Sequence, residues 1–236
     1  MKHGRLLAAA ATGLAGGSLL LGIPAASAAP GMDKTNKPGM DKTVSLQASL
    51  SELNFSGASG SATATVKNQK IENIAISATG LAPDAAHAIH IHFGEDARHE
   101  CPTMAEATNV RSATDPTPRL STADGLPAYG DIVVSLTTTG DTTPASGLAL
   151  DRFPASSGGM LSYNRSKIEF TDVAGVGTAK SIADAVRDGE GVLVVHGNDY
   201  NDNDAYDFEA AGKSELDPAL PAEGTDPTAC GVLAAH

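Results

Sequence analysis

The sequence predicts an all-β fold, and three observations lead to this prediction. Short runs in which apolar and polar residues alternate recur along the chain, as in strands that bury one face. The 25 glycines and 13 prolines supply many turn positions between these runs. Helical periodicity is rare, and only residues 181–187 have the pattern of a helix. A barrel or sandwich with long loops and one short helix is therefore expected.

The expected elements follow one another from residue 44. Ile74 and Ile76 alternate with small or polar neighbours, which is typical of a half-buried strand. Ser181 is placed to cap the helix, and Gly189 follows its end. Residues 94–128, and everything after Gly197, are expected to be long loops of functional importance or disorder. The expected strands are 44–54, 62–67, 71–79, 87–93, 131–137, 166–170 and 192–196.

Two short segments precede this single domain of residues 44–236. Residues 1–28 have a basic start, an apolar stretch and the pattern Ala26-Ser27-Ala28, which predict a secretory signal peptide. A retained membrane anchor is the alternative. Residues 29–43 repeat Gly-Met-Asp-Lys-Thr and are expected to form a flexible linker. The mature protein is thus predicted to be secreted, with no membrane association once the signal is removed.

The charge balance limits the possible partners. The formal net charge is -12 at pH 7. An acidic surface repels nucleic acid and anionic lipid, so neither is expected as a partner.

The chain has two cysteines, Cys101 and Cys230, in a protein expected to be exported. Disulfides persist in oxidising compartments, so one intramolecular bridge is the leading interpretation. Two free buried thiols are the alternative, which requires a reducing environment.

A histidine cluster is the strongest chemical signal. In the predicted strand 87–93, His90 and His92 project from one face while Ile89 and Ile91 project from the other. Two imidazoles at positions i and i+2 can share one metal ion, and imidazole suits copper, zinc, iron and nickel. His196 ends the apolar strand 192–196 and could supply a third ligand from a neighbouring strand. The alternative is a strand whose two histidines bind no metal.

At this point the chain resembles the copper/zinc superoxide dismutases. The matching stretches occur in the family's order over residues 80–233 and, taken together, are moderately specific. The resemblance implies a Greek-key β-barrel, copper ligands His90, His92 and His196, and a disulfide between Cys101 and Cys230. The matching stretches are 80–83 with the histidine strand, Cys101 after it, Tyr129-Gly130-Asp131, Val194-Val195-His196 and 229–233.

The sequence also departs from the family. The histidine that bridges copper and zinc should lie between Cys101 and Asp131, and no histidine occurs there. Asp131 alone is a vestigial zinc position, so zinc is not expected. Pro227 stands where the family has the arginine that guides superoxide. The resemblance therefore implies a copper protein whose partner is copper ion or superoxide, with slow dismutation or none. His99, in the following loop, is a candidate fourth ligand.

An acidic loop follows His196. Asp199, Asn201, Asn203 and Asp207 have the spacing of oxygen ligands in a calcium loop, but position 6 lacks the usual glycine and position 12 the usual glutamate. A solvated acidic loop is the alternative. The competing function is a non-enzymatic structural or interaction module stabilised by calcium. The other acids, Glu209, Glu215, Asp217, Glu223 and Asp226, are expected to form acidic surface.

Overall fold

The computed structural model describes residues 43–236, so the predicted signal peptide and nearly all of the predicted linker lie outside the described residues. Strands dominate the described chain, which confirms the all-β prediction. The long strands are β1 (Thr43–Glu52), β2 (Ser59–Lys67), β3 (Lys70–Thr79), β4 (Ile89–Phe93), β7 (Asp131–Ser135), β8 (Leu161–Glu169), β9 (Val192–His196) and β10 (Pro227–Val232). The two-residue strands are β5 (Asn109–Val110), β6 (Pro118–Arg119) and β11 (Ala234–Ala235), and the α-helices are α1 (Thr122–Tyr129), α2 (Ala179–Arg187) and α3 (Ala222–Thr225).

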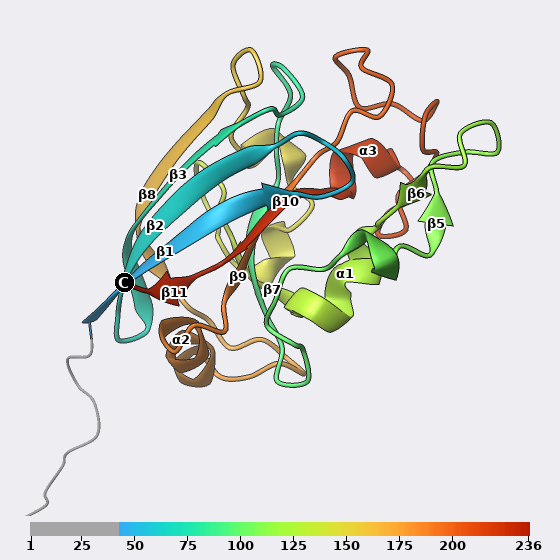
Figure 1. The fold of residues 1–236 in the computed structure, drawn as a ribbon. Helices are drawn as coiled ribbons and strands as arrows, with labels where there is room; N and C mark the ends of the chain where they lie inside the picture. Colours follow the sequence, from blue (N-terminus) through green and yellow to red (C-terminus); the bar gives the residue numbers. More distant parts are fainter. Residues whose placement is uncertain (1–42) are drawn as a thin grey trace, which may run out of the picture. The chain divides into compact units, whose positions relative to one another are not determined.

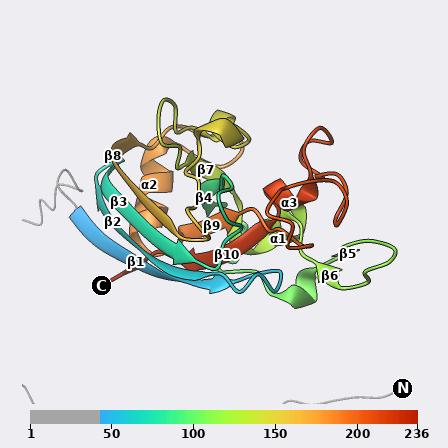
Figure 2. The ribbon, with the colours of Figure 1, turned by 90° about the horizontal axis from the view of Figure 1, so that it is seen from above.

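One antiparallel sheet forms the body of the domain. Its strand order is β7-β4-β9-β10-β1-β2-β3-β8, and β11 pairs with β1. The sheet curls into a half-barrel, so that β8 and β7 at its two ends rise on the same side (Figure 2). Tyr163 of β8 donates a hydrogen bond to the carbonyl of Thr137, just after β7 (3.0 Å). Side-chain contacts of this kind link the two ends of the sheet.

The concave face of the sheet buries the main core. Leu46, Leu50, Ile74 and Ile91 are among its members, and each is at most 4% exposed. In β1 the buried residues alternate with exposed ones, as the sequence pattern predicts. Each such side chain contributes roughly 1.5–3 kcal/mol by leaving water.

The convex face of β9 and β10 is buried as well. Val192, Val194 and Cys230 form a second cluster there with Leu120 and Tyr129, which come from the segment before β7. Because β9 is covered on both faces, its sequence is an uninterrupted apolar run up to the final histidine.

The prediction of a loop over residues 94–128 is wrong in part, because α1 begins within it. Ser121 Oγ accepts from the Asp124 backbone N–H (3.2 Å), and the Asp124 carboxylate accepts from the Ser121 N–H (2.9 Å). This capping box starts the helix. Gly125 and Pro127 interrupt its helical sequence pattern, so the pattern does not predict it. In Figure 1, β5, β6 and α1 of the connection 94–130 lie on the same side of the domain as α3 and the rest of the connection 197–226.

The predicted short helix is present as α2, but it begins two residues earlier than expected. Thr178, rather than Ser181, is the cap, and its hydroxyl accepts from the Ser181 N–H. Ile182 and Val186 face the core, and the helix lies at one end of the curled sheet (Figure 1). The structure also corrects the strands: β8 is longer than predicted, while β10 and β11 were not predicted.

A disulfide joins Cys101 to Cys230, which confirms the predicted bridge and rules out the free thiols. It ties the segment after β4 to β10. Cys230 is 1% exposed and packs in the second cluster beside Tyr129. The bridge therefore holds the connection between β4 and β7, which contains α1, against the convex face of β9 and β10.

Candidate metal centre

Three histidine side chains converge on the convex face of β4 and β9. The strands are antiparallel neighbours, with His90 opposite Val194 and the His196 N–H donating to the Ala88 carbonyl (2.8 Å). Ala88, His90 and His92 share one face, so His196 lies diagonally beside His90. One ring nitrogen of each histidine lies within 4.8 Å of those of the other two. The predicted meeting of these side chains is confirmed.

Backbone carbonyl groups hold all three rings in place. A carbonyl only accepts, so the bonded ring nitrogen carries the hydrogen and the other keeps its lone pair. The bonds are His90 Nε2 to Gly147 O (3.1 Å), His92 Nδ1 to Gly130 O (2.9 Å) and His196 Nδ1 to Thr225 O (2.7 Å). The remaining nitrogens, His90 Nδ1, His92 Nε2 and His196 Nε2, are buried and have no hydrogen-bond partner.

Three buried lone pairs without partners form an unusual group, because buried polar atoms nearly always find a hydrogen bond. A metal ion at the meeting point would satisfy all three at once. Neutral imidazoles bind first-row transition metals, and Cu²⁺ has the highest affinity among the divalent ions. The donor set therefore fits a transition-metal ion held by His90, His92 and His196.

Burial keeps these imidazoles neutral. It lowers the pKa of His92 to about 3, with a further contribution from His196. It lowers the pKa of His196 to about 4, and that of His90 well below its ordinary value. At neutral pH the lone pairs are therefore available without loss of a proton, which favours metal binding.

The metal-free protein is expected to lose stability as the pH falls from about 6.5 to about 4. The unfolded chain takes up protons at an ordinary histidine pKa of about 6.5, whereas the folded chain resists protonation. The contribution of the neutral histidines to the free energy of unfolding is complete above about pH 6.5. His196 alone supplies on the order of 3 kcal/mol of it. Thermal melts at pH 7 and pH 5 measure it, and the shift should be smaller in His196→Gln.

Asp226 changes the stability with pH in the opposite sense to the histidines. Burial raises the pKa of its carboxyl group to about 6 despite the neighbouring Arg119. Its contribution to stability is present at low pH and is lost as the pH rises through 6. Wild type and His196→Gln both contain Asp226. The difference between their pH shifts therefore measures the contribution of His196 alone. An equal pH shift in wild type and His196→Gln would contradict the prediction.

Two other histidines lie apart from this group. His99 stacks on Phe93 with ring centroids 5.3 Å apart, and its Nε2 bonds to the Gly94 carbonyl (2.8 Å). The structure therefore does not place His99 as a fourth ligand. His87 lies just before β4, and its Nδ1 hydrogen-bonds to the carbonyl of His196 (2.9 Å).

Asp131, the vestigial zinc position, is exposed at the start of β7. It lines a cavity that His92 also lines. Within residues 43–236, the three histidines are the one close group of three or more His, Cys, Asp or Glu side chains. Asp131 thus has no such partners around it.

The acidic loop uses its side chains to bind its own backbone. Asp199 accepts from the Asn201 N–H (3.3 Å) and the Asp204 N–H (2.7 Å). The Asn203 amide donates to Asp207 (2.6 Å). The carboxylates thus have hydrogen-bond partners within the loop, and calcium binding there stays a prediction.

The prediction of an acidic surface is wrong for Glu223 and Asp226, which are 0% and 2% exposed. Glu223 accepts from the backbone N–H groups of Tyr200 (2.9 Å) and Asp207 (2.8 Å). It thereby fastens the acidic loop to α3, the helix that contains Thr225. The ring of His196 is thus held by a helix that is itself anchored.

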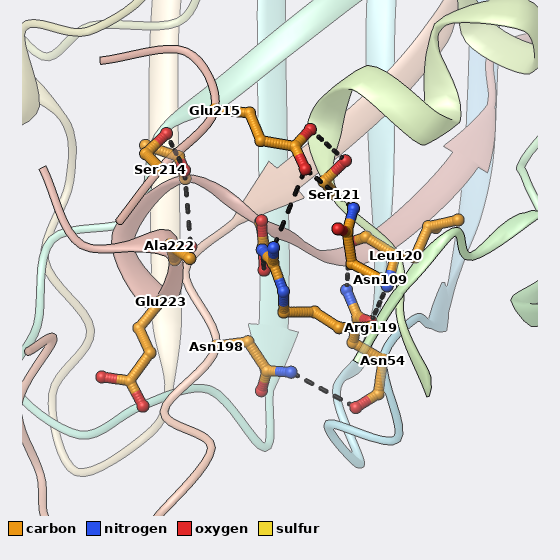
Figure 3. A network of polar contacts seen from close by, with 12 residues as sticks. Asn54, Asn109, Arg119, Leu120, Ser121, Asn198, Ser214, Glu215, Ala222 and Glu223 are labelled. Atoms are coloured by element: carbon orange, nitrogen blue, oxygen red, sulfur yellow. Dashed lines mark hydrogen bonds and ion pairs between the residues drawn. The ribbon is translucent and has the colours of Figure 1, made fainter. Parts of the chain in front are cut away.

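A polar network on the same side was missed by sequence reasoning. Arg119 is buried and donates to Asp226 (2.8 Å), 107 residues away. Glu215 lies between Arg119 (3.8 Å) and Ser121, from which it accepts a hydrogen bond of 2.8 Å (Figure 3). The network joins the residues before α1 to Glu215 and Asp226 in the connection between β9 and β10. No local pattern predicts it, because its members lie far apart in the sequence.

A second part of this network centres on Asn54. Its side chain exchanges two hydrogen bonds with the backbone of Leu120 (2.8 and 2.7 Å). The Asn198 amide donates to the Asn54 carbonyl (3.3 Å; Figure 3). The turn after β1 therefore holds the segment before α1, through Leu120, and the segment after β9, through Asn198.

No protein-family model matches the chain, and a search of curated proteins finds no match. None of the helices within residues 43–236 is long and apolar enough to cross a membrane.

Proposed function

We propose that this protein binds one copper ion through His90, His92 and His196. The observation that carries the proposal is the convergence of three buried ring nitrogens that lack partners. Copper is proposed over zinc because Cu²⁺ binds a given set of nitrogen ligands more tightly than Zn²⁺ does, and because the family resemblance implies copper at these three positions. Bound copper would supply one-electron redox chemistry, and the chain would supply neutral, fixed ligands.

The fold is proposed to be a divergent superoxide dismutase-like barrel. Three features support this resemblance: the curled antiparallel sheet, a ligand pair on one strand with a third on its neighbour, and the Cys101–Cys230 bridge. The bridge also supports export, because disulfides persist in oxidising compartments.

Copper binding, rather than rapid superoxide dismutation, is the proposed activity. No histidine occurs between Cys101 and Asp131, so the family's bridging ligand has no counterpart. Pro227 replaces the guiding arginine, and Arg119, the buried guanidinium nearby, is neutralised by Asp226. Dismutation by the copper-loaded protein should therefore be slow or undetectable.

Metal competition tests the proposal. Metal-free protein is offered Cu²⁺, Zn²⁺ and Co²⁺ against a chelator, and bound metal is measured by elemental analysis. One copper per chain, with nitrogen hyperfine splitting in the EPR spectrum, is expected. Preference for zinc, or a copper signal without nitrogen ligands, would overturn it. A dismutase assay on the same sample, with His90→Ala as the control, measures the residual enzymatic activity.

A further inference from the structure

Two adjoining cavities lie at the start of β7. One has a volume of about 390 Å³ and is lined by His92, and the other has a volume of about 340 Å³. Leu126, Asp131, Gly175 and Val176 line both cavities, which therefore form one groove, here called the β7 groove. Asp131 is exposed whereas His92 is 0% exposed. The β7 groove thus extends from the solvent to a buried member of the histidine cluster.

The β7 groove carries negative charge alone. Glu95, Asp96 and Asp131 line it, and all three are exposed. No lysine or arginine is among the described residues that line either cavity. Arg98, the nearest cation in the sequence, pairs instead with Glu100 (2.5 Å) and with Glu106. A cleft lined by charges of one sign concentrates ions of the opposite sign.

These carboxylates are also free to bind a cation. Other exposed acids of the domain are engaged, as Asp141 is by the Ser146 hydroxyl (2.6 Å). Within residues 43–236, the side chains of Glu95, Asp96 and Asp131 have no hydrogen-bond or ion-pair partner. Their oxygen lone pairs therefore face solvent without competition from the protein.

The buried end of the β7 groove points independently to a cation. His92 Nε2 is buried and has no partner. Asp131 directly follows Gly130, whose carbonyl holds the ring of His92 through Nδ1 (2.9 Å). The close group of ligand atoms contains the three histidines and not Asp131. Asp131 therefore lies next to the proposed copper site without belonging to it.

The order of ligand types along the β7 groove favours inward movement of copper. Imidazole suits copper, whereas carboxylate suits magnesium, calcium and manganese. A Cu²⁺ ion held by a carboxylate at the surface therefore gains free energy when it passes to the histidines. The small cavity that His90 and His196 line has no aspartate or glutamate among its described lining residues. Attraction of a cation is thus built into the approach on the His92 side.

We infer that the β7 groove is the entry route of the copper ion and that Asp131 is the carboxylate that captures the ion on its way to the histidines. This inference rests on the proposed copper site and adds a transient binding site to it. The transfer exchanges ligands on the ion without any change of oxidation state. It requires no proton to leave the histidines, because burial keeps their rings neutral.

The rate of copper uptake tests the inference. Metal-free protein is mixed with Cu²⁺ in a non-coordinating buffer, and tyrosine fluorescence is followed by stopped flow. The chain has no tryptophan, and Tyr129 packs on His92, so copper at the cluster should quench the emission. Asp131→Asn should lower the association rate constant about tenfold at low ionic strength. It should also weaken the dependence of that rate on salt, because one attracting charge is gone.

Two further variants separate the entry route from overall charge. Asp96→Asn, in the outer cavity, should lower the association rate constant about threefold. Asp151→Asn removes the same charge at an exposed residue that lines neither cavity, and it should change the rate less than about twofold. The EPR spectrum of copper-loaded Asp131→Asn should keep the nitrogen hyperfine pattern of wild type.

Three results would overturn the entry route while the copper site stands. They are an unchanged rate in Asp131→Asn, an equal fall in Asp131→Asn and Asp151→Asn, and an altered EPR spectrum in Asp131→Asn. The last would make Asp131 a ligand of the bound ion. Failure of wild type to bind copper through its histidines would overturn both proposals.

Discussion

Replacing His92 with alanine is expected to lower the copper affinity by more than about 100-fold. Loss of a residue that merely orients a ligand costs about 10–100-fold in metal affinity, and His92 is itself proposed as one of the three ligands. Its Nδ1 is held by the Gly130 carbonyl, and the ring of Tyr129 packs against it at a centroid distance of 4.5 Å. No nearby side chain is positioned to replace it in the described chain.

Copper affinity is measured by competition with a chelator of known strength, in parallel with the EPR spectrum. His99→Ala is the matched control, because His99 lies in the loop after β4 but bonds to the Gly94 carbonyl instead. That control should keep wild-type affinity and spectrum. Equal affinity in wild type and His92→Ala would show that copper binds elsewhere.

His92→Ala should also lower the stability of the metal-free protein, because it opens a cavity beside Tyr129 and leaves the Gly130 carbonyl without its donor. Removal of the buried Nε2, which has no partner, offsets part of this cost. Urea unfolding of the metal-free variant measures the lost structure separately from the lost ligation. The metal-loaded forms should differ by more than the metal-free forms, because a ligand that binds the native state alone stabilises it.

Removing the disulfide is expected to have the second large effect. The cysteines are 129 residues apart, and opening a loop of that size costs about 5 kcal/mol in the chain-entropy model. For a domain of this length the change corresponds to a fall of about 10–20 °C in Tm. The double variant Cys101→Ala with Cys230→Ala, compared with wild type in urea and thermal unfolding, measures it.

The same variant should weaken metal binding to a smaller extent. Cys230 packs in one cluster with Tyr129, and Tyr129 contacts the ring of His92. Wild type treated with a reductant should behave like the double variant, which controls for the lost side-chain volume. If the double variant and the reduced wild type each lost less than about 1 kcal/mol in free energy of unfolding, the connection that contains α1 would be held chiefly by its polar network.

The sequence predicts the histidine cluster because its main signals are local. Alternation within β4 places His90 and His92 together, and the apolar run of β9 delivers His196 to the next strand. The bridge was predictable because Cys101 had one possible partner. In each case a short pattern or a simple count carries the information.

The missed features depend on contacts between distant segments. The carbonyls of Gly147 and Thr225 orient two of the rings, but a backbone group leaves no trace in residue type. The partnership of Arg119 with Asp226 spans 107 residues and turns an expected surface acid into a buried one. Helix α1 was missed because Gly125 and Pro127 interrupt its periodicity.

Each imidazole connects a strand to a different connecting segment, at Gly130, Gly147 and Thr225. An ion that fixes the three rings would therefore fix all three segments in one event. Segments that open independently in the metal-free protein would then open only together, as a single cooperative unit. Their amide hydrogens would become protected from exchange in concert, at residues that never touch the metal.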